Sequence, residues 1–149
     1  MGEADQEVVP SAPLWAIAFL RDARVGRLAT AYAAGRPLVV PICYAFDGAH
    51  CFSAVDAKPK RTRNLRRLSN IAANPHVSLV VDRWDEDWSQ LCWVIVEGRA
   101  EVLTGGVAFT RAVDLLVAKY PQYRGLPLDR DGGAVVAITP ERILAWRPA

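Results

Sequence analysis

The chain has 149 residues, of which 52% are hydrophobic and 23% charged, and its formal net charge is +2. These values are typical of one globular domain and exclude general disorder, because a chain of this length buries a large core without disulfides or metals. No apolar run approaches the ~20 residues of a membrane span, and the acidic first residues do not form a signal peptide. We therefore expect a cytoplasmic protein that does not enter a membrane.

The cysteines, Cys43, Cys51 and Cys92, are odd in number and widely spaced. A disulfide framework needs more of them, and a structural zinc site needs Cys or His pairs at short spacing. The two histidines, His50 and His76, complete no such pair. The sequence therefore predicts three reduced thiols buried in the core and no metal site.

The first half of the chain predicts a helix followed by three strands. Residues 1–12 are polar and predict a flexible N-terminal tail, so the single domain is expected at 13–149. Pro13 opens an apolar-rich helix, and Asp47-Gly48 is the strongest hairpin signal in the chain. The elements are predicted as a helix over 13–22 and strands over 24–33, 38–46 and 49–55.

The second half alternates helices with strands. Leu65, Leu68 and Ile71 form one apolar stripe at helical spacing, and Asn74-Pro75 ends that helix. Gly98 lies inside a long apolar strand and indicates a bulge. The elements are predicted as helices over 59–73 and 107–119 and strands over 76–82, 91–103 and 134–146, the last interrupted at 139–141.

Six strands that follow one another with tight turns favour an antiparallel sheet around one core. The predicted fold is therefore mainly β (α+β): a closed or nearly closed barrel of six antiparallel strands with peripheral helices.

Residues 58–67, called the basic segment below, carry the strongest local signal. They hold six of the 18 basic residues and no acid, which leaves 16 acidic residues against 12 basic ones elsewhere. Such concentration favours a local anionic ligand over an extended polyanion such as a nucleic acid. The segment enters a helix, and a helix start offers unpaired N–H groups to phosphate. Lys60, Arg61 and Thr62 are the nearest candidates.

The chain resembles the split β-barrels of the pyridoxamine 5′-phosphate oxidase class, which bind FMN or deazaflavins. The resemblance covers about residues 14–148 and is specific in combination. It is similar most of all to the small actinobacterial enzymes proposed to use coenzyme F420, a deazaflavin. Its motifs are the opening RVGRLAT at 24–30, FSAV at 52–55, RNL at 63–65, NPHVSL at 74–79, VEGRA at 96–100 and WRP at 146–148.

The resemblance implies a homodimer with each cofactor in a groove between the subunits. It implies that the backbone of the second strand contacts the cofactor ring and that residues of the third strand lie beneath the cofactor. It also implies that residues at the start of the following helix bind the phosphate. Two registers make either Lys60 or Arg61 the main phosphate residue. The implied cofactor-binding residues are Pro41, Ile42, Cys43, Ser53, Ala54, Val55, Lys58, Lys60, Arg61, Thr62, Arg63 and Asn64.

The resemblance also implies that hydride chemistry resides on the cofactor, in agreement with the absence of a catalytic triad or paired carboxylates. Trp84, Trp88 and Trp93 are candidates for stacking on a flat ring or substrate, with packing as the alternative. We expect an oxidoreductase that transfers a hydride between reduced F420 and a small organic acceptor. The alternatives are an FMN-dependent oxidoreductase of the same fold and a non-catalytic flavin- or tetrapyrrole-binding protein.

Overall fold

The computed structural model describes residues 9–55, 63–128 and 133–149, with only the backbone of residues 63–65. Within these ranges there are three α-helices and two short 3-10 helices. They are α1 (Leu14–Asp22), α2 (Arg63–Ala73), α3 (Gly106–Lys119), η1 (Trp88–Gln90) and η2 (Pro121–Gly125). The strands are β1 (Gly26–Ala31), β2 (Pro37–Ile42), β3 (Ala45–Phe46), β4 (Cys51–Val55), β5 (His76–Arg83), β6 (Cys92–Leu103) and β7 (Ala134–Trp146).

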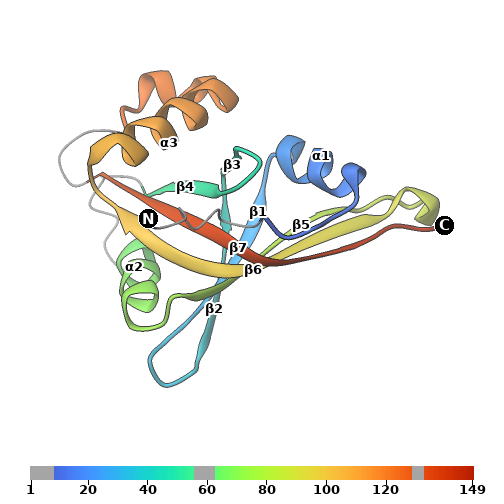
Figure 1. Ribbon diagram of the computed structural model, residues 1–149, viewed down its shortest axis with the longest axis horizontal. Helices are drawn as coiled ribbons and strands as arrows, with labels where there is room; N and C mark the ends of the chain where they lie inside the picture. The colour runs from blue at the N-terminus through green and yellow to red at the C-terminus, as the bar shows by residue number, and fades with distance from the viewer. Residues whose placement is uncertain (1–8, 56–62, 129–132) are drawn as a thin grey trace, which may run out of the picture.

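The strands form one antiparallel sheet in the order β2-β1-β5-β6-β7-β4-β3 (Figure 1). The two edge strands, β2 and β3, are joined by only Cys43 and Tyr44. The three Cα–Cα steps from Ile42 to Ala45 span at most about 11 Å even when extended. The sheet therefore has to curl until its edges approach, which makes it a split barrel, as the resemblance predicts.

Alternation along the strands fills the barrel with aliphatic side chains. Leu28, Leu79, Val96 and Val136 are fully buried in one cluster that also includes Ala16 and Leu20 of α1 and Ile71 of α2. Each buried aliphatic side chain contributes roughly 1.5–3 kcal/mol. The core therefore holds both helices against the sheet.

The third helix lies outside the barrel. Phe109 and Ala112 of α3 pack on Phe52 of β4 and on Val135 and Ala137 of β7. Within the described residues, no helix packs in this way on the outer face of β2, β1 and β5. Val39 of β2 accordingly remains 61% exposed.

The sheet has seven strands and not the predicted six, because the predicted second strand, 38–46, is interrupted at Cys43 and Tyr44. The main chain of Tyr44 pairs with a side chain in place of a strand. Its N–H donates to the Tyr120 hydroxyl at 3.2 Å, and its carbonyl accepts from the same hydroxyl at 3.1 Å. A local sequence pattern cannot predict this pair of hydrogen bonds, because Tyr120 is 76 residues away from Tyr44.

The other elements agree closely with the prediction. The final strand is continuous from Ala134 to Trp146, where an interruption was expected. The bulge predicted at Gly98 is confirmed by a shift in the β6–β7 register between Glu97 and Gly98. A Cβ at Gly98 would collide with the carbonyl oxygen of Thr139, so the close approach of the two backbones requires glycine here.

Candidate functional site

The predicted ring-binding residues lie on the two sides of the split. Pro41 and Cys43 are exposed at the end of β2, whereas Ile42 is buried in the core. Across the split, β4 pairs with β3 only through Cys51 and Phe52, while all of β4 pairs with β7. Among the described strands, the Ser53–Val55 end of β4 therefore has a neighbour on one side only.

The side chains of this β4 end point in different directions. Ser53 is 1% exposed, and Val55 packs in the barrel core, whereas Ala54 packs against the cluster of Tyr120 and Leu128. The Ser53 hydroxyl is buried without a hydrogen-bond partner in the part of the chain that the structure describes. A buried hydroxyl without a partner is costly, so this group is a candidate for a ligand contact.

The phosphate candidates Lys58, Lys60, Arg61 and Thr62 lie outside the described residues. Arg63 and Asn64 begin α2, and the structure describes only their backbone. Val55, at the end of β4, and Arg63, at the start of α2, therefore flank the first half of the basic segment in the sequence. The assignment of phosphate binding to these residues remains a prediction.

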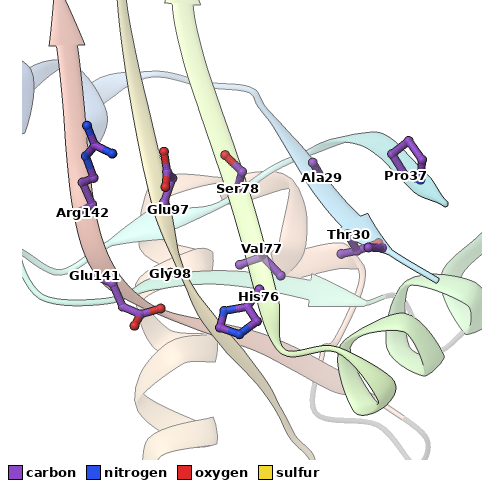
Figure 2. A pocket seen from close by; sticks show the side chains of 11 residues that line it. Ala29, Thr30, Pro37, His76, Val77, Ser78, Glu97, Gly98, Glu141 and Arg142 are labelled. Atoms are coloured by element: carbon purple, nitrogen blue, oxygen red, sulfur yellow. The ribbon is translucent and has the colours of Figure 1, made fainter. Parts of the chain in front are cut away.

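An open cleft of about 550 Å³ lies on the outer face of β1, β5, β6 and β7 (Figure 2). We call it the sheet-face cleft. Four of its residues, Ala29, Ala31, Ser78 and Gly98, have small side chains or none, so its floor is flat. The full lining is Ala29, Thr30, Ala31, Pro37, His76, Val77, Ser78, Glu97, Gly98, Glu141 and Arg142.

The register explains how these residues meet. Ala29 pairs with Ser78, Ser78 with Glu97, and Glu97 with Arg142, so four adjacent strands place one residue each in a row across the face. Figure 2 shows Glu97 and Arg142 side by side on neighbouring strands. The charged side chains of the lining are Glu97, Glu141 and Arg142, and an exposed histidine, His76, lies at the α2 end.

A buried hydrogen bond ties α2 to the cleft floor. Asn70 Nδ2 donates to Thr30 Oγ1 at 3.1 Å, and both residues are almost fully buried. Arg67, one turn before Asn70, is 8% exposed, and burial lowers the pKa of its guanidinium. Because α2 begins inside the basic segment, at Arg63, its position relative to β1 links the α2 part of that segment to the cleft.

The sheet-face cleft contains none of the residues predicted to bind the cofactor. Pro37 lines the cleft at the start of β2, whereas Ile42 is the last residue of that strand and Cys43 follows it. Five residues of strand span about 16 Å. The described residues therefore present two separate surfaces, the split and the sheet-face cleft.

The three predicted stacking residues do not meet at either surface. Trp84 and Trp88 lie in the β5–β6 connection and are 66% and 67% exposed. Trp93 is half-buried on β6, where it pairs with Asp82 and Trp146. Their role in stacking remains a prediction.

A cationic cluster supports the Tyr44 turn from the α3 side. Lys119 Nζ donates to the Ala23 carbonyl at 2.7 Å and lies 4.2 Å from the centroid of the Tyr44 ring. Burial, followed by repulsion from Arg24, lowers the pKa of Lys119 to about 8. Burial also raises the pKa of Cys51 to about 12, so this thiol stays protonated and inert. All three cysteines are free, but the prediction of three core thiols is wrong for Cys43, which is exposed because it lies in the break between β2 and β3; Cys51 and Cys92 are buried.

Sequence reasoning missed the sheet-face cleft because its residues come from four strands, and no short motif contains them. The usable signal was Gly98 within VEGRA, together with Ser78 in NPHVSL. Both motifs belong to the family resemblance, but a sequence does not show that they lie side by side. That neighbourhood depends on the register between β5 and β6. No group of side chains suited to hold a metal ion occurs among the described residues, and no helix there is long and apolar enough to cross a membrane.

Comparison with known families finds one match, to the model of the pyridoxamine 5′-phosphate oxidase family, over residues 16–147. No curated protein matches the chain. Among solved structures, an FAD-binding protein from Mesorhizobium loti is 26% identical, with a TM-score of 0.68 over 91% of this chain and 92% of its own.

Two further structures share the fold at lower identity. A conserved hypothetical protein from Mycobacterium tuberculosis is 22% identical, with a TM-score of 0.72 over 98% of this chain and 90% of its own. HutZ, the heme storage protein from Vibrio cholerae, is 16% identical, with a TM-score of 0.69 over 87% of this chain and 89% of its own.

Proposed function

Because the chain belongs to the pyridoxamine 5′-phosphate oxidase family, we propose that it is an oxidoreductase that transfers a hydride between reduced coenzyme F420 and a small organic acceptor. The observation that carries the proposal is the sheet-face cleft, whose flat floor of small residues suits a planar ring system. Its volume of about 550 Å³ falls in the range of cofactor and ligand sites, roughly 300–1,000 Å³.

The residues present fit such a coenzyme in two parts. Ala29, Ala31 and Gly98 leave room for a ring to lie against the strands, and Arg142 supplies a cation at the edge of that floor. The basic segment supplies the charges that an acidic handle needs, at the start of a helix. The buried Ser53 hydroxyl and the open edge of β4 offer further polar contacts beside it.

These two surfaces lie apart on one chain, and a homodimer brings them together in the proposal. The cleft of one protomer then faces the split and the basic segment of its partner. The uncovered outer face of the sheet favours this arrangement, because Val39 and Trp146 leave apolar surface exposed there, at 61% and 43%. The small-molecule acceptor lies over the ring in the same groove.

The coenzyme supplies the hydride when it is bound, and the chain supplies binding and orientation. Arg142 neutralises negative charge at the rim, and the small floor residues fix the plane in which a ring lies. The exposed His76, at the α2 end of the cleft, is placed to donate a proton to a reduced acceptor. No side-chain nucleophile is needed for this chemistry.

F420 is favoured over FMN by the size of the basic segment. Six cations exceed what one phosphate needs, whereas the phosphodiester and oligoglutamate tail of F420 carry several negative charges. The FAD-binding neighbour from Mesorhizobium loti supports FMN or FAD as the alternative coenzyme. The structural likeness to a heme storage protein supports a second candidate function, non-catalytic tetrapyrrole binding, with His76 available as an iron ligand.

Titration of the purified chain into F420, FMN and heme, followed by fluorescence quenching or absorbance, separates these functions. We expect the tightest binding for F420, and oxidation of reduced F420 when a small enone or quinone acceptor is added. Tight heme binding without coenzyme binding would establish storage or sensing instead. Tighter binding of FMN than of F420, together with turnover of an acceptor, would keep the proposal of an oxidoreductase and change its coenzyme to FMN.

A further inference from the structure

A second cleft lies at one end of the barrel, between α1 and three strand ends: the end of β5, the start of β6 and the residue after β7. We call it the helix-side cleft. Its volume is about 480 Å³ and it shares no residue with the sheet-face cleft. Figure 1 shows α1 beside the part of these strands that extends towards the C-terminus of the chain. The lining residues are Trp15, Ala18, Phe19, Asp22, Ala23, Arg83, Cys92 and Arg147.

The strand side of this cleft presents two arginines. Arg83 pairs with Cys92 at the last register position of β5 and β6, and Cys92 is buried at 4% exposure. Arg147 directly follows the last residue of β7, two positions after Ala145, which packs against the core. Both arginines therefore continue the inward-facing rows of the barrel beyond its apolar core.

Each guanidinium is held over an aromatic ring of α1. Arg147 Cζ lies 4.9 Å from the Trp15 ring centroid, and Arg83 Cζ lies 5.8 Å from that of Phe19. Arg83 Nε also donates to the Gln90 carbonyl at 2.7 Å, which fixes this side chain further. A guanidinium held beside a ring keeps its remaining N–H donors free at its edge for a planar acceptor.

The positive charge of these arginines is not neutralised by an ion pair. The ion pairs of the described residues join Arg27 to Asp82 and Arg111 to Asp47, and neither Arg83 nor Arg147 takes part in one. The one acid in the cleft lining is Asp22. Two guanidiniums and one carboxylate leave a net charge of +1, which suits a ligand with a single negative charge.

We propose that the helix-side cleft binds a monoanionic carboxylate carried on a flat apolar group. The carboxylate bonds to the free N–H donors of Arg83 and Arg147, where bidentate geometry is available. The apolar group packs among Trp15, Phe19 and Ala18. Asp22 disfavours a phosphate dianion at the same place. This site goes beyond the proposed oxidoreductase function and does not depend on it.

The test uses 2-naphthoate as the probe and its uncharged amide, 2-naphthamide, as the matched control, with isothermal titration of the full chain. We expect the acid to bind at least about tenfold more tightly than the amide, because the charge-assisted bonds are lost with the charge. Equal binding of acid and amide, or no binding of the acid, would overturn the proposal. This comparison uses no variant, so it holds even where a substitution impairs folding.

Variants then locate the binding site of the probe. Arg83→Gln and Arg147→Gln are each expected to weaken 2-naphthoate binding about tenfold. Arg124→Gln, an exposed arginine in η2, and Arg142→Gln, in the sheet-face cleft, are expected to leave it unchanged. A loss confined to Arg142→Gln would move the probe to the sheet-face cleft and overturn the assignment. Tighter binding of 2-naphthyl phosphate than of 2-naphthoate would overturn the preference for a monoanion.

Discussion

Asn70 of α2 donates a hydrogen bond to Thr30 of β1 across 40 positions of sequence, and the two side chains are buried at 2% and 4% exposure. Thr30 also lines the sheet-face cleft, and α2 begins inside the basic segment, at Arg63. One buried polar contact therefore connects the two surfaces that the proposed function uses.

Asn70→Ala is expected to lower the free energy of unfolding by about 1–3 kcal/mol, because it leaves the buried Thr30 hydroxyl without its donor. Ser69→Ala, on the exposed side of the same helix, is the matched control and is expected to cost less than about 0.5 kcal/mol. Urea unfolding measures both. A double-mutant cycle with Thr30→Val that shows simple additivity would contradict a specific coupling between the two residues.

Gly98→Ala is expected to destabilise the chain by about 1–3 kcal/mol or more, because the added methyl group meets the Thr139 backbone, which cannot move aside as a side chain can. Gly125→Ala is the control, since an added Cβ there contacts nothing. Thermal unfolding of both variants compares them directly. A Gly98→Ala variant as stable as the wild type would show that the β6–β7 bulge opens without cost.

Lys119 makes stability depend on pH in a direction that its pKa fixes. Its pKa is about 8 in the folded chain and near 10.5 when unfolded, so between these values the unfolded state binds more protons. The contribution of Lys119 to the free energy of unfolding is therefore least favourable to the folded state below pH 8. It becomes more favourable as the pH rises towards 10.5.

The measurement compares the wild type with Lys119→Met by urea unfolding at several pH values. The pKa of Cys51 is raised chiefly by burial, which both proteins share, so most of the Cys51 contribution cancels in the difference; the lowering by the Lys119 charge is absent from the variant. We expect the difference in unfolding free energy to shift in favour of the wild type from pH 8 to pH 10. A difference that is independent of pH, or one that shifts the other way, would show that the folded chain does not disfavour the lysine charge.

Arg142→Ala is expected to weaken coenzyme binding about fivefold or more, because it removes the one arginine in the sheet-face cleft lining. Arg99→Ala is the control: this arginine is exposed on β6, carries the same charge and lies outside the cleft lining. Fluorescence titration with F420 measures both. Equal losses in the two variants would indicate a general charge effect, against a specific role of Arg142.

Local patterns predicted most of the fold. The Asp47-Gly48 turn, the apolar stripe of α2 at Leu68 and Ile71, and the Gly98 bulge each depend on neighbouring residues and agree with the structure, whereas the Leu65 side chain lies outside the described part of the chain. The break after Ile42 could not be predicted, because it depends on the Tyr120 hydroxyl, which replaces a strand partner for Tyr44. That one long-range contact accounts for the difference between six strands and seven.

The candidate site divides in the same way. The basic segment is continuous in sequence, so it could be predicted as a charge cluster. The family resemblance, in turn, indicated the residues near Cys43 and those near Ser53 as neighbours of the cofactor. The row from Ala29 through Ser78 and Glu97 to Arg142 depends on the register of four strands, so no sequence window contains it. The two arginines of the helix-side cleft escaped for the same reason.

The central claim is that the basic segment holds the acidic handle of a planar redox coenzyme. The most direct test is fluorescence titration of F420 with the wild type, the double variant Lys60→Ala/Arg61→Ala and the control Arg124→Ala, with circular dichroism to verify the fold. The account predicts binding at least about tenfold weaker in the double variant and unchanged binding in the control. Wild-type binding of neither F420 nor FMN, or full affinity in the double variant, would contradict it.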